Sequence, residues 1–239
     1  MSYNKPVNII PLNDEERIRQ LHQYNITDNA LAHDFDTILL LITDIFQKGQ
    51  AFINFVDAEY VFSTANKTDG TNKIARVESL CSLAILEDSP TLFLDTKLVP
   101  DFLHAPYLSA NKEIRFYVAV PLKNAEGFNI GTIGVMDYLP NQDVSDHQLN
   151  TLKLLAALVM EKLEARLSNI LLTQTNILNL RRLVHDLKNP ITTISLYAQL
   201  LGNKEMTADK VFVMANRIEK SSVDIQNNLN NLLTETQSR

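Results

Sequence analysis

The chain has 239 residues, of which 45% are hydrophobic and 21% are charged, a balance typical of a globular protein with one or two domains. Its net charge of −6 argues against nucleic acid as the main partner, because phosphate binding needs basic patches. The single cysteine, Cys81, excludes an internal disulfide and fits a reducing cytosol. No stretch approaches the apolar length of a membrane span and the N-terminus has no signal-peptide core, so we expect a cytoplasmic chain.

The first predicted elements follow a short leader at 1–13 and open a mixed domain over residues 14–165. A short helix begins with the acidic turn at Asp14, and a longer helix over 34–48 ends at Gly49. The pattern then changes from helical spacing to alternation, which is typical of strands.

A sheet is predicted from apolar segments rich in β-branched and aromatic side chains. These segments are 51–57, 60–63, 91–94, 114–122 and 130–138. The last two form the strongest hairpin, because Gly127 supplies the turn between them. The polar run at 64–73 is predicted to be a loop, and 77–86 a short helix that carries Cys81.

A long helix is predicted to start at the capping-box pattern of Ser145 and Gln148. With Leu163 taken as heptad position a, apolar residues recur every seven places, and a second apolar row lies three places further on. The a positions are Leu163, Ile170, Ile177, Val184, Ile191 and Ala198, and the d positions include Leu180, Leu187, Ile194 and Leu201. A seam of this length predicts a helix that packs along a partner helix.

A second helix is predicted after a turn that begins at Gly202. Its apolar residues also recur every seven places, at Val211, Ile218, Ile225 and Leu232. Two antiparallel helices with one apolar stripe each cannot hide both stripes alone. We therefore expect residues 166–236 to form a helical hairpin that dimerises into a four-helix bundle.

The most informative residue is His185, which falls at heptad position b and therefore points away from the predicted seam. Asp186 is the next residue, and Asn189 lies four places later, on the same face of the helix. Neutral imidazole is a nitrogen nucleophile near pH 7, and a carboxylate bonded to one ring nitrogen leaves the other free to attack. This arrangement suits a phosphoryl acceptor.

The stretch His-Asp-Leu-Lys-Asn-Pro resembles the phosphoacceptor box of sensor histidine kinases, and the resemblance covers about residues 170–236. It implies that His185 takes the γ-phosphoryl group of ATP and that Asp186 acts as acid/base and orients the ring. It also implies that Asn189 positions water to dephosphorylate a partner response regulator, and that Pro190 bends the helix. The alternative is a solvent-facing histidine on a coiled coil with an incidental proline.

The hairpin at 114–122 and 131–137, followed by Pro140 and the capping pattern at Ser145, resembles a GAF domain over residues 14–165. The resemblance implies an α+β fold with a central antiparallel sheet of five or six strands and helices on its faces. It also implies dimerisation through the terminal helices. GAF domains bind many small molecules or none, so the ligand stays open.

The candidate ligand-pocket residues of this domain are Cys81, Asp95, Arg115 and Tyr117, with Asp101 beside them. Cys81 is followed by Ser82 and not by the histidine common in bilin-binding relatives, so we favour a small core residue. For Asp95 we favour capping of a turn, and for Arg115 an ion pair at the sheet rim. No histidine stands at metal-ligand spacing from another histidine or a cysteine, so no metal site is expected.

ATP binding is not expected from these residues, because only Gly202 of six glycines follows His185 and no Gly-rich phosphate loop is present. ATP and magnesium would then bind an ATP-binding domain outside this chain, and kinase activity would need that domain in trans. The leading hypothesis is the sensory and phosphoacceptor half of a cytoplasmic two-component sensor histidine kinase, which relays phosphate to a response regulator. The alternatives are an ATP-independent phosphotransfer or phosphatase protein and a non-catalytic dimeric GAF ligand-binding module.

Overall fold

The computed structural model describes residues 9–26, 34–47, 49–63, 73–99, 114–202 and 207–237, with side chains up to residue 230. The chain divides into two compact units, Met1–Leu167 and Ser168–Arg239, which we call the sheet domain and the hairpin domain. None of the helices within the described ranges has both the length and the apolar character needed to cross a bilayer.

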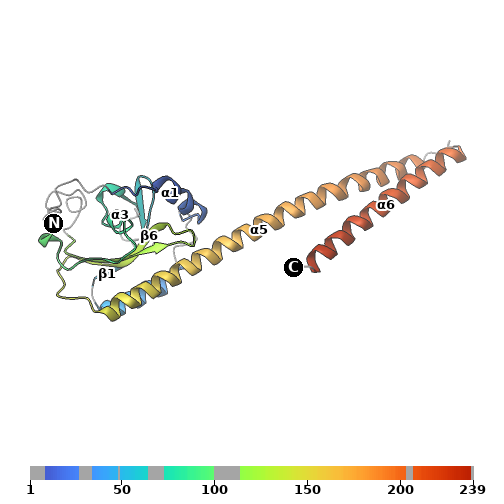
Figure 1. Ribbon diagram of the computed structural model, residues 1–239. Coiled ribbons are helices and arrows are strands. Elements are labelled where there is room, and N and C mark those ends of the chain that lie inside the picture. Colours follow the sequence, from blue (N-terminus) through green and yellow to red (C-terminus); the bar gives the residue numbers. More distant parts are fainter. Residues whose placement is uncertain are drawn as a thin grey trace. The chain divides into compact units, whose positions relative to one another are not determined.

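An antiparallel sheet forms the centre of the sheet domain (Figure 1). It has six strands in the order β3-β2-β1-β6-β5-β4. The strands are β1 (Gln50–Val56), β2 (Tyr60–Ser63), β3 (Lys73–Ala75), β4 (Thr91–Phe93), β5 (Phe116–Lys123) and β6 (Asn129–Asp137). The predicted α+β class and antiparallel sheet are confirmed. The predicted segments pair into this sheet, and the central strands β1, β5 and β6 contribute side chains to an apolar layer on each face.

Strand β3 is the one that the sequence analysis missed, because it placed Lys73 at the end of a loop. Its three residues form an edge strand paired with β2, with Val61 opposite Ile74. An edge strand of this length carries too few alternating positions to be recognised from the sequence. The rest of the predicted loop, residues 64–72, lies outside the described residues.

The helices of the sheet domain are α1 (Asp14–Gln23), α2 (Asp36–Phe46) and α3 (Cys81–Ala84), with two 3-10 turns at Arg76–Glu78 and Thr96–Leu98. Helix α2 ends at Phe46, because Gln47 adopts a left-handed conformation with φ 53° and donates its N–H to the carbonyl of Thr43. Gly49, where we expected the end, has φ 77° and lies against β6. A Cβ there would stand 2.6 Å from a methyl group of Val135.

The helix predicted over 77–86 is wrong in extent, because it divides into the 3-10 turn Arg76–Glu78 and the four-residue α3. Serine side chains cause the break. The Ser82 hydroxyl donates to the carbonyl of Arg76 at 2.7 Å, and the Ser79 hydroxyl accepts from the N–H of Cys81 at 3.2 Å. Such local side-chain bonds to the backbone compete with regular helix.

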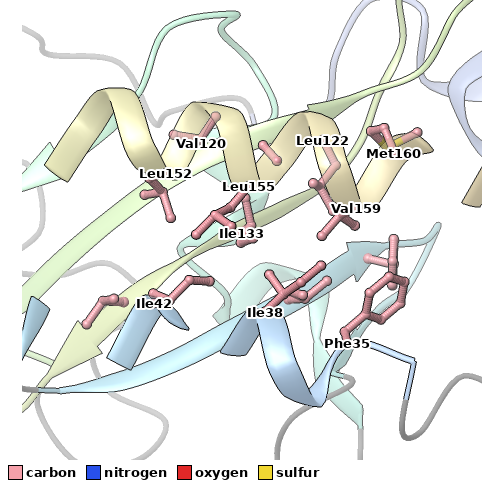
Figure 2. Close-up of a cluster of buried hydrophobic side chains, with 14 of the residues drawn as sticks. Phe35, Ile38, Ile42, Val120, Leu122, Ile133, Leu152, Leu155, Val159 and Met160 are labelled. Atoms are coloured by element: carbon pink, nitrogen blue, oxygen red, sulfur yellow. The ribbon is translucent and has the colours of Figure 1, made fainter. Parts of the chain in front are cut away.

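Two apolar layers lie on opposite faces of the sheet. Helices α1, α2 and the start of α5 cover one face, where Ile42, Ile133 and Val159 are fully buried (Figure 2). The other face packs against α3 through a smaller cluster that includes Phe52, Cys81 and Tyr117. On this second face, Gly134 lies opposite Ala119, and a Cβ at Gly134 would stand 2.9 Å from the Phe52 ring.

Helix α5 (Asp146–Leu201) has 56 residues and contributes to both units, and α6 (Ala208–Gln237) completes the hairpin domain. The predicted capping box starts α5. The Ser145 N–H donates to Gln148 Oε1 at 3.0 Å, and the Gln148 N–H donates to the Ser145 hydroxyl at 3.2 Å. The predicted turn after Gly202 falls at residues 203–206, outside the described residues.

The seam between α5 and α6 differs from the predicted one. On α5 the half-buried residues of this seam include Leu183, Leu187, Pro190, Ile194, Tyr197 and Leu201, and on α6 they include Met214, Ile218 and Ile225. The d-position residues Leu187, Ile194 and Leu201 are therefore half-buried together with residues just before the a positions, whereas the d-position residue Leu180 is 59% exposed. The a-position residues Ile177, Val184 and Ile191 stay exposed, at 45%, 64% and 53%.

Candidate functional site

His185 lies on α5 with its side chain 74% exposed, next to Asp186, whose side chain is 62% exposed. The two are joined by a contact of 3.2 Å between His185 Nδ1 and Asp186 Oδ1. Within the part of the chain that the structure describes, this is the one polar contact of the ring, so Nε2 faces solvent. The His185 side chain therefore points away from the half-buried residues of α5, as its heptad position predicted.

The Asp186 contact decides which ring nitrogen can react. A carboxylate accepts a hydrogen bond, so the contact favours the neutral tautomer that carries its hydrogen on Nδ1. The lone pair then lies on Nε2, the exposed nitrogen. This is the arrangement of an activated nitrogen nucleophile whose orientation is held by a carboxylate.

Asn189 is exposed and lies one helical turn after His185. Residues four apart share a face of an α-helix, so its side-chain amide and the imidazole project to the same side. An amide can both donate to and accept from a water molecule. The pair therefore has the groups needed to hold a water beside an electrophile bound over His185.

Pro190 lies inside α5, and it has no N–H to donate to the carbonyl of Asp186. Two threonines follow it and bond to neighbouring carbonyls. Thr192 Oγ1 donates to the Lys188 carbonyl at 2.7 Å, and Thr193 Oγ1 donates to the Asn189 carbonyl at 3.0 Å. The sequence analysis did not single out these threonines, although two hydroxyls just after a mid-helix proline are a recognisable pattern. The predicted bend stays a prediction.

Three cationic side chains surround His185, and the sequence analysis did not single them out either. Arg181, Arg182 and Lys188 are exposed and stand four before, three before and three after His185. Residues at these spacings are neighbours on the helix surface. Their charges favour the approach of phosphate groups and of acidic protein surfaces. The spacing of three and four from the histidine is the signal that could have identified them.

Cys81 and Tyr117, two of the candidate pocket residues, meet inside the second apolar layer. Cys81 Sγ accepts from Asn54 Nδ2 at 3.2 Å and lies 3.5 Å from the Tyr117 hydroxyl. The Tyr117 ring also stacks on Phe52, with centroids 5.5 Å apart. Burial, and then the neighbouring Cys81, raise the pKa of Tyr117 well above its ordinary value. The Oδ1 atom of Asn54 is buried without a partner among the described residues.

Asp95 and Arg115, the other two candidates, form an ion pair. Arg115 Nε and Nη2 donate to the two carboxylate oxygens at 2.7 and 2.5 Å. Asp95 Oδ1 also accepts from the N–H of Lys97, which caps the 3-10 turn at Thr96–Leu98. The hydrogen bond from Arg115 lowers the pKa of Asp95. Asp101 lies outside the described residues, and a pocket role for the four candidates stays a prediction.

Comparison with known proteins places the family match on the helices around His185. Residues 178–239 match the family model described as His Kinase A (phospho-acceptor) domain. Over 179 residues the chain is 30% identical to the cyclic di-GMP phosphodiesterase PA2567 of Pseudomonas aeruginosa PAO1. That alignment covers 74% of this chain, which spans 30% of the length of that enzyme.

Among solved structures, the chain is similar to the GAF domain of an Acinetobacter phosphoenolpyruvate-protein phosphotransferase. The identity is 14% and the TM-score 0.46, over 67% of this chain and 95% of that one. It is also similar to a type II free methionine-R-sulfoxide reductase from Thermoplasma acidophilum, at 18% identity and a TM-score of 0.46, over 57% and 94% of the two chains. The family match contains His185, Asp186, Asn189 and Pro190. This chain therefore carries a His Kinase A phospho-acceptor domain at residues 178–239.

Proposed function

We propose that the chain is the sensory and phosphoacceptor half of a two-component sensor histidine kinase and that His185 Nε2 is phosphorylated. One observation carries the proposal: within the matched domain, the His185 ring is exposed and held through Nδ1 by Asp186, with Nε2 toward solvent. His Kinase A domains generally dimerise and pair with response regulators. The histidine is placed where such partners could reach it.

The proposed step is nucleophilic attack by the Nε2 lone pair on the γ-phosphorus of ATP. The new bond is N–P, and the bond that breaks joins that phosphorus to the bridging oxygen, whose electrons leave with ADP. The Nδ1–H stays hydrogen-bonded to Asp186, which stabilises the positive charge that develops on the ring. Attack of an aspartate of the response regulator on the same phosphorus then restores the neutral imidazole.

ATP is the substrate that donates the phosphoryl group, and an ATP-binding domain outside residues 1–239 would hold it together with the magnesium ion that neutralises its phosphate charge. What this chain contributes is positioning and charge, which account for most of the catalysis of phosphoryl transfer. Arg181, Arg182 and Lys188 attract the transferring phosphoryl group, and Asp186 orients the ring.

The test is phosphoryl transfer to the whole chain from a histidine-kinase ATP-binding domain with labelled ATP, or from a phosphorylated receiver domain. Wild type should acquire acid-labile label, and His185→Ala should acquire none. His147→Ala is the matched control, because His147 is also exposed on α5 and also adjoins an aspartate. Label on His185→Ala, or its loss in His147→Ala, would contradict the assignment.

A second activity, dephosphorylation of the response regulator, is favoured by the exposed amide of Asn189 one turn from His185. Asn189→Ala should slow dephosphorylation of the phosphorylated regulator by about tenfold or more, since positioned water accounts for effects of this order. It should leave labelling of His185 within about twofold. Regulator dephosphorylation at the wild-type rate in Asn189→Ala would exclude this role.

We propose that the hairpin domain dimerises with a second copy of the chain. The support is the row of a-position residues that stays open although the hairpin is closed, with Ile177, Val184 and Ile191 exposed at 45%, 64% and 53%. Residues of this kind, repeated every seven places, form the inner seam of a four-helix bundle. The dimer would be symmetric, with the same stripe on both copies.

We propose the sheet domain as the sensor, with the face under α3 as the ligand-binding side. The buried Asn54 Oδ1 is an acceptor that a ligand or water could satisfy beside Cys81 and Tyr117. The ion pair of Asp95 with Arg115 lies just before β5 and would serve as a rim.

A further inference from the structure

Residues 162–166 of α5, at the end of the sheet domain, make polar contacts on both sides of the row of buried apolar residues that ends at Leu163. Leu163, 1% exposed, is the last fully buried residue of that row. Its neighbours Lys162 and Glu164 project about 100° to either side of it, since each residue turns an α-helix by that angle. Arg166 projects to the same side as Lys162. Contacts made by these residues therefore act on opposite flanks of the helix.

On one flank, Glu164 meets Tyr24, the residue that caps the end of α1. The Tyr24 hydroxyl donates to Glu164 Oε1 at 2.5 Å, and Tyr24 is only 2% exposed. A hydrogen bond to a charged acceptor that is mostly shielded from water is among the stronger ones in proteins. It joins helices α1 and α5, which are 140 residues apart along the chain.

On the other flank, two cations meet Asp34, which lies just before α2. Lys162 Nζ donates to the Asp34 backbone carbonyl at 3.0 Å. Arg166 Nη1 lies 3.8 Å from Asp34 Oδ2, within ion-pair distance. Lys162 and Arg166 are one turn apart, so both hold the same side of α5. Rotation of α5 in one direction would break these contacts, and rotation in the other would break the bond to Tyr24.

The heptad register links this place to the phosphoacceptor. Glu164 follows the a-position residue Leu163, as His185 follows Val184, so both occupy position b, three heptads apart on α5. In a helix with an apolar repeat of seven, residues at the same heptad position face the same way relative to the seam. A rotation that passes along α5 from Glu164 would therefore change the direction in which His185 faces.

We propose that Tyr24, Asp34, Lys162, Glu164 and Arg166 form a rotational lock on α5, and that release of this lock changes phosphoryl transfer at His185. The regulatory half of this inference rests on the proposed function, whereas the lock itself does not. Tyr24 and Glu164 are positioning residues, since they act through α5 and touch no reacting atom.

The experiment uses the whole chain with Tyr24→Phe, Glu164→Gln and the double variant. Amide hydrogen exchange over residues 160–175 should become about tenfold faster in each, because local opening no longer breaks a charged hydrogen bond. Exchange in the double variant should be no faster than in either single variant, because each single variant already removes the same hydrogen bond. Phosphoryl transfer to His185 should change by about fivefold, in the same direction in all three.

Two control variants and an internal reference separate the lock from general loosening. Tyr60→Phe removes a hydroxyl from a tyrosine that is 41% exposed on β2, and Glu161→Gln changes an exposed carboxylate on α5. Both should behave as wild type. Exchange in β5 and β6 should stay constant in every variant.

Three results would overturn the inference: unchanged exchange over 160–175, exchange that rises equally in β5 and β6, or wild-type transfer rates in variants whose exchange has risen. If wild type itself accepts no phosphate from any donor, the proposed function fails. The exchange data would then still decide whether the lock exists.

Discussion

At the scale of single residues, His185 is the proposed nucleophile and Asp186 is the residue that orients its ring. In the proposed reaction, the contact of 3.2 Å between Nδ1 and the Asp186 carboxylate leaves Nε2 free to act as the nucleophile. Because both side chains are largely exposed, their geometry depends on adjacency along the helix and not on a surrounding core. The local order His-Asp was therefore enough to identify the pair from the sequence.

Asp186→Asn should slow phosphorylation of His185 by on the order of a hundredfold, because the amide cannot stabilise the charge that develops on the imidazole. The helix should be unaffected, since residue 186 is solvent-facing. The measurement is the initial rate of labelling with a fixed donor. Asp146→Asn, at the start of the same helix, is the control, and equal rates in Asp186→Asn and Asp146→Asn would contradict the role of Asp186.

Other residues at the site could not be assigned a role from local order alone. Thr192 and Thr193 matter because of where their hydroxyls bond after Pro190, which becomes visible only once the helix is known to continue through the proline. Cys81 and Tyr117 are far apart in the chain, and their contact at 3.5 Å depends on the packing of α3 on the sheet.

At the scale of elements, a half-buried carboxylate between two arginines joins α1 to the rest of the sheet domain. Asp14 accepts from Arg17 Nε at 2.8 Å and from Arg76 Nη1 and Nη2 at 2.7 and 2.9 Å. Arg17 and Arg76 are only 1% and 4% exposed. Burial by itself raises the pKa of Asp14, but the hydrogen bonds from Arg76 and Arg17 outweigh it, and the pKa lies below 3.8.

This lowered pKa predicts acid sensitivity of the sheet domain. A carboxyl group with a lower pKa in the folded state stabilises the fold above its unfolded pKa, and that stability is lost as pH falls through the folded pKa. The free energy of unfolding should therefore fall below about pH 4. In Asp14→Asn the free energy of unfolding should fall by about 3 kcal/mol at pH 7, because two buried arginines lose the anion that pairs with them. The free energy of unfolding of this variant should also depend less on pH below about pH 4 than that of wild type.

The measurement is urea unfolding of the chain between pH 3 and pH 7, monitored with a probe that reports on the sheet domain. Asp88→Asn is the control, since it removes an exposed ion pair with Lys123 and should change stability little. An Asp14→Asn variant with the same pH dependence as wild type would refute the assignment.

The elements themselves were predictable where a long regular pattern exists. The four longest strands follow from apolar segments rich in β-branched and aromatic residues, and α5 follows from heptad spacing. The elements that were missed or predicted with the wrong extent are short ones. Strand β3 has too few residues to show a pattern, and the helix over 77–86 is interrupted by hydroxyl bonds from Ser79 and Ser82 that no periodicity reveals.

At the scale of the whole molecule, the apolar residues of α5 are divided between the hairpin with α6 and the proposed contact with a second copy of the chain. The heptad pattern predicts one apolar stripe, made of the a and d positions, against one partner helix. In the hairpin domain the d-position residues Leu187, Ile194 and Leu201 are half-buried, and the a-position residues Ile177, Val184 and Ile191 remain exposed. A helix in a bundle needs a broader apolar face than a helix in a two-stranded coiled coil, and the heptad pattern alone does not say which partner takes which row.

Ile177→Lys should shift the chain from dimer to monomer, because it puts a charge into the proposed inner seam. Sedimentation equilibrium at micromolar concentration measures this directly. Thr175→Lys adds the same charge to the same helix at an exposed position outside the seam and should stay dimeric. A monomeric wild type, or a dimer that survives Ile177→Lys, would disprove the proposed interface.

The central claim is that His185 accepts phosphate on Nε2 because Asp186 occupies the Nδ1 side. Phosphorus and nitrogen NMR of the phosphorylated, nitrogen-15-labelled chain distinguishes the two ring linkages. We expect a single phosphohistidine, at His185, linked through Nε2. A linkage through Nδ1, or phosphate on another residue with His185 unmodified, would contradict it.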